Sequence, residues 1–277
     1  MPVHDPTTLE LLHNGTLEVL GRIVEASNAT LLCTVELDGV LEHCVYKPIR
    51  GERPLWDFPD GTLADREVAS YLVSAATGWG VVPPTVLREG PFGSGMVQLW
   101  IDTTAATIED SGTEHVEQVS DLVELCEPGQ VPAGWKHILR AQDYSGEVVV
   151  LAHADDPKLR RMAVLDLVLN NADRKGGHVL AALDGSVYGV DHGICLHTEN
   201  KLRTVLWGWA GESLCEEDVD VLGRLAAQLQ GELAERLHTH LTVREVDSIN
   251  RRVRRLLACP TMPKPTGSRP AIPWPAF

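Results

Sequence analysis

Basic residues are scarce in this chain relative to acidic ones. The 277 residues include 24 Lys and Arg against 39 Asp and Glu, which gives a formal net charge of -15 at pH 7. Such a balance repels the phosphates of nucleic acids and the headgroups of anionic lipids over most of a protein surface. We therefore expect neither broad nucleic-acid binding nor adhesion to an anionic membrane, although a local basic patch stays open.

Long apolar runs are missing as well. No stretch approaches the roughly 18 apolar residues that a membrane-spanning helix requires, and residues 1–20 lack the basic-then-apolar pattern of a signal peptide. Hydrophobic residues make up 44% and charged residues 23% of the chain, which is ordinary for a globular protein. These features predict a cytoplasmic protein without a stable membrane anchor.

Cysteine pairs with metal-ligand spacing are also absent. The six cysteines are scattered and none forms a C-x-x-C motif: Cys33, Cys44, Cys126, Cys195, Cys215 and Cys259. We interpret them as reduced thiols of a cytoplasmic protein, neither disulfides nor a zinc site. The length of the chain allows one large domain or two small ones.

The most informative stretch spans residues 165–196. An apolar, helix-like run over residues 165–170 gives way to a polar, glycine-containing loop at residues 171–178. Two short strands are expected next, at residues 178–183 and 187–190, because Asp-Gly-Ser between them is typical of a turn. The stretch therefore predicts a helix, a polar loop and a hairpin.

Acidic residues flank this predicted hairpin. Asp173 precedes it and Asp191 follows it, so the hairpin brings both carboxylates to one end. Phosphoryl transfer needs such a pair, since one carboxylate orients the attacking hydroxyl and another holds the metal. Asp173 and His178 have the spacing D-x-x-x-x-N with His in the last place, and Asp191-His192-Gly193 stands where D-F-G would. The alternative for either Asp alone is an ordinary turn residue.

This pattern resembles the phosphatidylinositol 3-/4-kinase-like branch of the protein-kinase fold. The loop N-x-D-R-x-x-x-(N) and the D-x-G that follows are most similar to type II phosphatidylinositol 4-kinases, HipA-like kinases and small actinobacterial relatives. The resemblance implies an α+β, two-lobed protein-kinase-like fold, with a small antiparallel-sheet N-lobe and a mainly helical C-lobe. We expect the N-lobe at residues 1–101, the C-lobe at 102–259 and a Pro-rich tail at 260–277.

Three strands are predicted near the N-terminus, at residues 17–25, 31–37 and 42–48. A small polar turn joins the first two, and its backbone N–H groups could lie over nucleotide phosphates. The turn comprises Ser27, Asn28, Ala29 and Thr30. It lacks G-x-G-x-x-G, but a Ser-containing loop is similar to that of phosphatidylinositol-kinase relatives; an ordinary hairpin turn is the alternative.

Lys47 ends the third predicted strand, and an amphipathic helix is expected about twenty residues later, at residues 65–73. Glu67 lies near the start of that helix. A helix glutamate that pairs with a strand lysine is the arrangement that positions the lysine on nucleotide phosphates in kinases. We therefore predict a Lys47–Glu67 ion pair; the alternative is a solvent-exposed lysine.

The sequence E-x-A-x-Y-L, then V-P-P-T, then Q-L-W-I is similar to the same branch, where it covers the glutamate helix, a strand and the hinge. By that resemblance, four residues would contact adenine through backbone N–H and C=O groups: Gln98, Leu99, Trp100 and Ile101. A buried central strand is compatible with the same residues.

The remaining patterns are helical for the most part. We expect helices at residues 114–125 and 158–170 and over most of 216–258, and a short strand at 146–152. Asp156 and Pro157 have the residue types of an N-cap and a first helical position. The tail is expected to be extended or disordered unless Trp274 and Phe277 dock onto the body.

The hypothesis is an ATP-dependent kinase that uses Mg²⁺ or Mn²⁺. Asp191 and His178 would bind metal, Asp173 would act as base, and Arg174 or Lys175 would stabilise the transferring phosphoryl group. Since imidazole is a poor ligand for Mg²⁺, the protein prefers Mn²⁺, depends on one metal, or is inactive.

Several alternatives stay open. A pseudokinase would bind nucleotide or a partner without transfer. Related folds modify proteins or transfer AMP, and a non-kinase interaction protein would make the spacings coincidental. The acceptor is unknown; the acidic charge favours a soluble protein or small molecule over a lipid.

Overall fold

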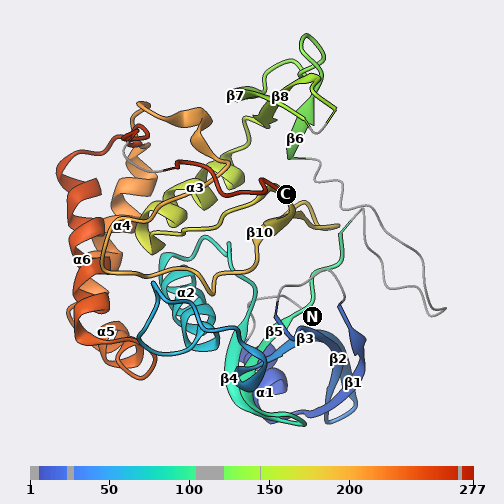
Figure 1. Cartoon of the computed structure of the whole chain (residues 1–277). Helices are drawn as coiled ribbons and strands as arrows, with labels where there is room; N and C mark the ends of the chain where they lie inside the picture. Colours follow the sequence, from blue (N-terminus) through green and yellow to red (C-terminus); the bar gives the residue numbers. More distant parts are fainter. Residues whose placement is uncertain (1–5, 24–27, 104–121, 144, 268–269) are drawn as a thin grey trace.

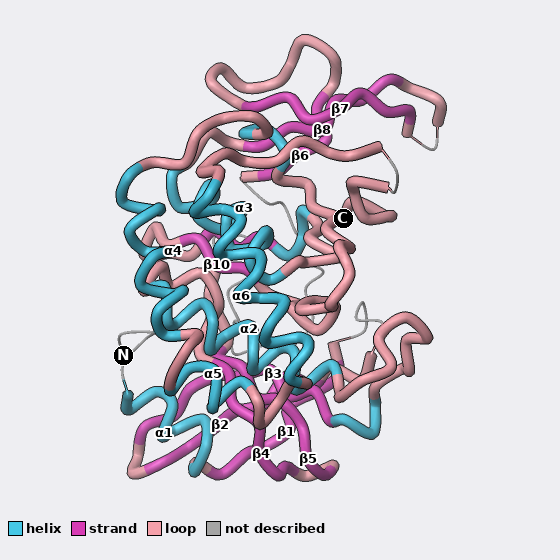
Figure 2. The backbone as a smooth tube through the Cα atoms, turned by 90° about the vertical axis from the view of Figure 1, so that its left-hand side faces the viewer, coloured by secondary structure: helices cyan, strands magenta, loops and turns pink. Residues whose placement is uncertain are grey.

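The computed structural model describes residues 6–23, 28–103, 122–143, 145–267 and 270–277. An antiparallel sheet occupies the N-terminal part and helices dominate the C-terminal part, which confirms the predicted α+β fold class (Figure 1). A smaller three-stranded sheet projects from the helical part at the end far from the large sheet (Figure 2). The lobe boundaries stay a prediction.

The N-terminal sheet has five strands in the order β1-β2-β3-β5-β4, and every neighbouring pair is antiparallel. Its strands are β1 (Thr16–Arg22), β2 (Leu31–Leu37), β3 (Val40–Pro48), β4 (Thr85–Gly90) and β5 (Gly93–Leu99). Alternate side chains of β2 and β3, such as Val35 and Tyr46, are buried, as a sheet with one covered face requires. Helix α1 (Pro6–Asn14), which we did not predict, covers that face with Leu11 and Leu12.

Helix α2 (Leu63–Thr77) links the sheet to the helical part. Thr62 caps its start by accepting the N–H of Asp65, and Gly78 ends it in the left-handed conformation at φ 70°. Arg66 forms a buried ion pair with Glu245 of α6 (Val243–Ala258) at 2.5 Å between Nη2 and Oε1. Helix α2 and the buried Arg66–Glu245 ion pair therefore connect the sheet to the helical part.

The C-terminal part is built around α3 (Pro157–Leu169). The Asp156 carboxylate accepts the N–H groups of Lys158 and Leu159, which confirms the predicted cap. Asn170 ends the helix in the left-handed conformation at φ 55° and so turns the chain into the next loop. The elements that follow are η2 (Gly176–His178), β9 (Val179–Ala181), β10 (Val187–Gly189), η3 (Trp207–Trp209), α4 (Glu216–Gln228), α5 (Glu232–Leu237) and α6.

The smaller sheet corrects one prediction. Residues 123–126 form strand β6 (Val123–Cys126), not the end of a helix, and residues 114–121 lie outside the described part of the chain. The sheet has the order β6-β8-β7, with β7 (Lys136–Gln142), which we did not predict, and β8 (Val148–His153), whose position matches the expected strand. Strand β8 is apolar and rich in β-branched residues, and it pairs with β6 along one edge and with β7 along the other. This strand pairing outweighs the weak helical periodicity of residues 123–126.

The Pro-rich tail is ordered against the body over its described residues. Met262 and Ile272 pack against the main core, and Phe277 reaches the loop after α3. The Trp274 side chain is 79% exposed and does not dock. The docking that we left open therefore occurs through Phe277 and not through Trp274.

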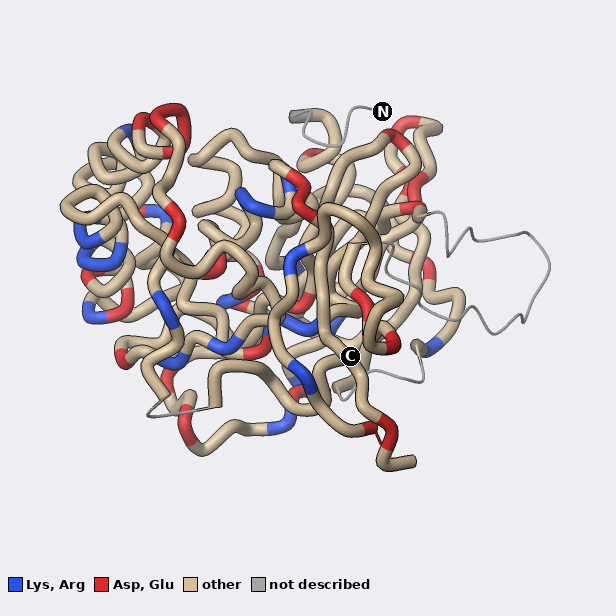
Figure 3. Tube along the Cα trace, turned by 90° about the horizontal axis from the view of Figure 1, so that it is seen from above, with Lys and Arg blue, Asp and Glu red and all other residues tan. Residues whose placement is uncertain are grey.

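Two properties of the surface complete the fold. Within the described residues, no helix is long and apolar enough to span a bilayer. Lys and Arg are interspersed with Asp and Glu along the chain (Figure 3). Basic residues therefore occur in several places on a chain whose net charge is strongly negative.

Candidate functional site

A cavity of about 200 Å³ lies between the N-terminal sheet and the loops that follow α3. It receives side chains from segments far apart in the sequence. Its lining comprises Asn28, Ala29, Thr30, Lys47, Pro48, Glu52, Arg53, Leu55, Leu63, Ala64, Glu67, Met96, Asp173, His178, Asp191, Gly193 and Ile194. Both predicted carboxylates and the predicted lysine thus face one space.

Lys47 and Glu67 form the predicted ion pair. Lys47 lies at the end of β3 and Glu67 in the first turns of α2, and Nζ is 2.8 Å from Oε1. The other carboxylate oxygen of Glu67 accepts the backbone N–H of His192 at 2.9 Å. Glu67 is buried, so this carboxylate holds the lysine and the Asp191-His192-Gly193 turn in one fixed arrangement.

Asp191 occupies a strained backbone position beside Lys47. Its φ of 59° is left-handed, which non-glycine residues adopt at a cost and which is common at functional sites. Lys47 Nζ contacts Oδ1 of Asp191. The Lys47 ammonium holds the pKa of Asp191 well below its usual range, against the opposing effect of burial. Burial also acts to lower the pKa of Lys47, but Asp191 and Glu67 outweigh it and raise that pKa. Both groups are therefore charged at neutral pH.

Asp173 lies in the loop after α3, at the C-terminal side of Asn171. The backbone N–H of Asp173 donates to the side-chain carbonyl of Asn171 at 2.9 Å, which fixes the turn. Its side chain is 28% exposed. Burial, helped by the negative charge of Asp191, raises the pKa of Asp173 to about 6. A carboxylate with this pKa is matched to accept a proton near neutral pH.

His178 points toward the same carboxylate as Lys47. Its Nε2 is 3.4 Å from Oδ2 of Asp191, and burial lowers the pKa of the imidazole to about 4. The ring is therefore neutral at physiological pH, as a metal-ligating imidazole must be.

Two side chains that could bind a divalent metal ion face the cavity. Asp191 and His178 provide one carboxylate and one imidazole on the same side of the cavity. No cluster of three or more His, Cys, Asp or Glu side chains with metal-site geometry occurs among the described residues. Two protein ligands suit a cation that also binds nucleotide phosphates, and an imidazole favours Mn²⁺ over Mg²⁺. The residues therefore fit a metal held jointly with a nucleotide.

The predicted role of Arg174 is wrong. Its side chain is 0% exposed and forms an ion pair with Asp166, with Nη2 3.1 Å from Oδ1, and Nη1 donates to the carbonyls of His178 and Val190. Its Nη2 also donates to Nε2 of His192 at 2.6 Å. A guanidinium held by so many partners is a structural link between the loop and the hairpin, and it is not a flexible cation for a phosphoryl group.

Lys175 remains the flexible cation beside Asp173. Its Nζ is 4.0 Å from Oδ2 of Asp173, and its side chain is 22% exposed. It does not line the cavity in this structure. A role for Lys175 in phosphoryl transfer stays a prediction.

Residues 28–30, which precede β2, lie on one side of the cavity. Ser27 lies outside the described residues, whereas Asn28, Ala29 and Thr30 line the cavity. The Asn28 side-chain carbonyl accepts the N–H of Arg53 at 3.1 Å, so the turn is attached to the segment after β3. The turn is therefore at the position expected of a phosphate-binding loop.

The predicted hinge residues are not at the cavity. Gln98, Leu99, Trp100 and Ile101 are absent from its lining. The Leu99 N–H donates to Pro84 and the Trp100 N–H to His43, so the sheet already uses the donors that we expected to contact adenine. Gln98 is buried and its amide donates to Thr85. A buried central strand, which is compatible with the hinge interpretation, describes Gln98 and Leu99, and contact of residues 98–101 with adenine stays a prediction.

Several lining residues were missed in the sequence. Glu52 accepts the N–H groups of Leu63 and Ala64 and so caps α2 at the cavity edge. Met96 of β5 and Ile194 after Gly193 add apolar surface. Glu52 stands in a Pro- and Gly-rich loop and had no motif to reveal it, whereas the position of Ile194 directly after Asp-His-Gly was a usable signal.

Comparisons with known proteins give one strong match. Protein Rv2133c of Mycobacterium tuberculosis is 53% identical over 267 residues, which cover 96% of this chain and 94% of that protein. No protein-family model matches the chain.

A solved structure shows a weaker likeness. The Helicobacter pylori proinflammatory kinase CtkA aligns over 88% of this chain and 97% of its own with a TM-score of 0.41 and 13% identity. On sequence identity over nearly its whole length, the chain belongs to the family of the mycobacterial protein Rv2133c.

Proposed function

We propose that this protein is an ATP-dependent phosphotransferase with its nucleotide in the cavity described above. One observation carries the proposal: the Lys47–Glu67 ion pair, Asp191 and Asp173 converge on one cavity from β3, α2, the Asp-His-Gly turn and the loop after α3. Each provides a function that phosphoryl transfer requires, namely phosphate binding, metal binding and orientation of the acceptor hydroxyl.

The phosphates would be bound from the sheet side. Lys47, held by Glu67, donates to phosphate oxygens, and residues 28–30 lie beside them. The Ala29 N–H donates to the Gly51 carbonyl at 3.4 Å here and would exchange that weak bond for a phosphate oxygen. Nucleotide binding must first separate Lys47 from Asp191, which contact each other here. We therefore expect Lys47 to move to the phosphates when Asp191 binds metal.

The acceptor would approach from the side of Asp173. This carboxylate accepts or aligns the proton of the acceptor hydroxyl, and its raised pKa favours proton acceptance near neutral pH. Asp191 and His178 would hold the metal. When bound, that ion supplies positive charge that offsets the charge of the phosphates. Lys175 stands beside Asp173 and would neutralise charge on the transferring group.

The acceptor is proposed to be a soluble protein or small molecule. The net charge of -15 opposes binding to an anionic lipid surface, where a lipid acceptor would be found. We also propose a cytoplasmic location, a requirement for Mg²⁺ or Mn²⁺, and no nucleic-acid partner.

A pseudokinase is the second candidate function. It is favoured by His178, which replaces the usual oxygen ligand, and by the contact between Lys47 and Asp191, which neutralises the metal-binding carboxylate. Such a protein would bind nucleotide or a partner without phosphoryl transfer.

The deciding experiment measures ATP binding and turnover with Mg²⁺ and then with Mn²⁺. Wild type is compared with Asp173→Ala, with Asp191→Ala, and with Asp220→Ala as a control at an exposed position of α4. We expect Asp191→Ala to lose metal-dependent binding, Asp173→Ala to bind but not transfer, and the control to behave as wild type. Binding without transfer under either metal identifies the pseudokinase, and absence of ATP binding refutes the kinase and any nucleotide-binding pseudokinase.

A further inference from the structure

The C-terminal tail follows a defined path over the segment after Asp191. The N–H of Leu214 donates to the Pro260 carbonyl, and that of Gly211 to Met262, both at 2.8 Å. Further along, the Ala271 carbonyl accepts the N–H of Thr204 at 3.0 Å and the indole N–H of Trp207 at 2.8 Å. The tail is therefore attached to residues 204–214 through backbone groups.

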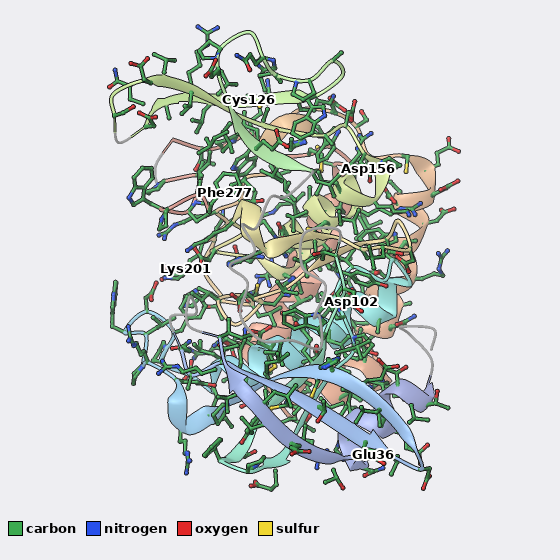
Figure 4. The ribbon with its side chains drawn as sticks, turned by 90° about the vertical axis from the view of Figure 1, so that its right-hand side faces the viewer. Glu36, Asp102, Cys126, Asp156, Lys201 and Phe277 are labelled. Atoms are coloured by element: carbon green, nitrogen blue, oxygen red, sulfur yellow. The ribbon has the colours of Figure 1, made fainter. Side chains whose placement is uncertain are left out.

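The path ends on the loop that carries Asp173. The Gly176 N–H donates to the Ala276 carbonyl at 2.8 Å. The Phe277 ring lies on Gly176 so closely that a Cβ there would be 2.1 Å from the ring carbon Cε1. Only glycine allows this approach. In Figure 4, Phe277 lies between Cys126 of the smaller sheet and Lys201.

Gly176 stands between the two functional ends of this loop. Asp173 and Lys175 precede it and His178 follows two residues later. Arg174 anchors the loop from inside through Asp166 and the His178 carbonyl. Gly176 itself is anchored from outside, because its N–H is satisfied by the tail.

We infer that Ala276 and Phe277 form a positioning element that fixes Asp173 and His178 relative to each other through Gly176. The inference rests on the proposed function, since it concerns the geometry of that same site. Phe277 is 40% exposed, and its ring covers Gly176. Reactive groups must be held within fractions of an ångström, and a displacement of about 1 Å can lower turnover roughly 100-fold.

The test combines Phe277→Ala with Gly176→Ala. Phe277→Ala is expected to lower kcat about 10- to 100-fold with little change in the KM for ATP, while the denaturation midpoint stays near that of wild type. Phe277→Leu, which still covers Gly176, should restore most of the rate. Trp274→Ala is the matched control, because this neighbouring side chain is 79% exposed and should leave kcat unchanged.

The double variant gives the sharper result. Gly176→Ala alone should displace the tail, since its new Cβ collides with the Phe277 ring. In the Phe277→Ala background the same methyl group has room, so the double variant should be no slower than Phe277→Ala alone. The inference would be overturned if the losses of kcat in Gly176→Ala and Phe277→Ala multiplied in the double variant. A Phe277→Ala enzyme as fast as wild type would overturn it as well.

A second readout does not depend on turnover. Amide hydrogen exchange at Gly176 should accelerate at least tenfold in Phe277→Ala, because the bond to Ala276 is weakened. Unchanged exchange overturns the inference whether or not ATP is consumed. If wild type shows no turnover while exchange at Gly176 responds to Phe277→Ala, the proposed function fails and the tail contact stands.

Discussion

The carboxylate of Glu67 accepts the backbone N–H of His192 at 2.9 Å, although 125 residues separate the two. Its other oxygen holds Lys47 at 2.8 Å. One buried side chain of α2 therefore sets the position of both Lys47 and the turn that presents Asp191. This dependence makes Glu67 the most direct test of how the two parts of the molecule cooperate.

Glu67→Gln should weaken metal-dependent ATP binding by about 10- to 100-fold. Charge-assisted hydrogen bonds of this kind contribute roughly 1.5–3 kcal/mol, and without Glu67 the lysine keeps only Asp191, for which the metal competes. Titration calorimetry with a nonhydrolysable ATP analogue measures the change. Glu36→Gln, at an exposed position of β2 far from the cavity, is the control. Equal affinities for Glu67→Gln and wild type would refute the role of the ion pair.

Arg174→Met should destabilise the protein by about 3–5 kcal/mol, because it leaves the buried Asp166 carboxylate without its cation. Urea denaturation measures the loss, and Arg244→Met on the exposed face of α6 should change stability by less than about 0.5 kcal/mol. Adding Asp166→Asn to Arg174→Met should recover part of the loss. A variant as stable as wild type would contradict the structural role that we assign to Arg174.

Asp173→Asn should stabilise the fold at pH 7.5 while it abolishes turnover. The native pKa of about 6 exceeds the unfolded value of about 4, so the native state binds the proton more tightly and stability falls as pH rises between them. This difference in pKa corresponds to up to about 3 kcal/mol in the free energy of unfolding. Because Asp173 is partly exposed, we expect Asp173→Asn to gain about 1–2 kcal/mol. Urea denaturation at pH 7.5 and pH 4 measures it. The gain should shrink toward zero at pH 4, and a gain of equal size at both values would exclude this cause.

Turnover should decline as pH falls through about 6. Asp173 accepts a proton only when it is ionised, so kcat/KM is expected to drop about tenfold for each pH unit below its pKa. Initial rates between pH 5 and pH 8 at saturating metal give the profile. A rate that stays constant from pH 8 down to pH 5, as expected for an ordinary carboxyl group, would show that burial does not tune Asp173.

Local sequence patterns were sufficient for most elements and for the main site. The cap of α3 by Asp156 and the hairpin after Asp173 depend on contacts within a few residues, which is why their positions were predictable. The Lys47–Glu67 pair was predicted from the resemblance to kinases, in which a helix glutamate pairs with a strand lysine, and the structure contains this ion pair. Helix α1 and strand β7 were missed, since neither has a periodicity that stands out from its surroundings.

Two contacts that the sequence did not predict share a physical cause. The N–H groups of Leu99 and Trp100 were expected to face a nucleotide, but they bond to Pro84 and His43, which approach only in the folded sheet. Arg174 was expected to be flexible, but it is buried against Asp166. In each case, the tertiary structure provides a hydrogen-bond or ion-pair partner for a group that the sequence alone left free to bind a ligand.

Local sequence patterns indicate which residues carry charge and chemistry, and in what local conformation: a lysine at a strand end, a glutamate on a helix, and carboxylates on either side of a hairpin. Only the tertiary structure decided which of them meet. It joins Glu67 to His192, buries Arg174 beside Asp166, and sets Phe277 on Gly176. The reason is that these contacts span from 8 to more than 100 residues and depend on the competition among all buried polar groups for partners, which no local pattern records.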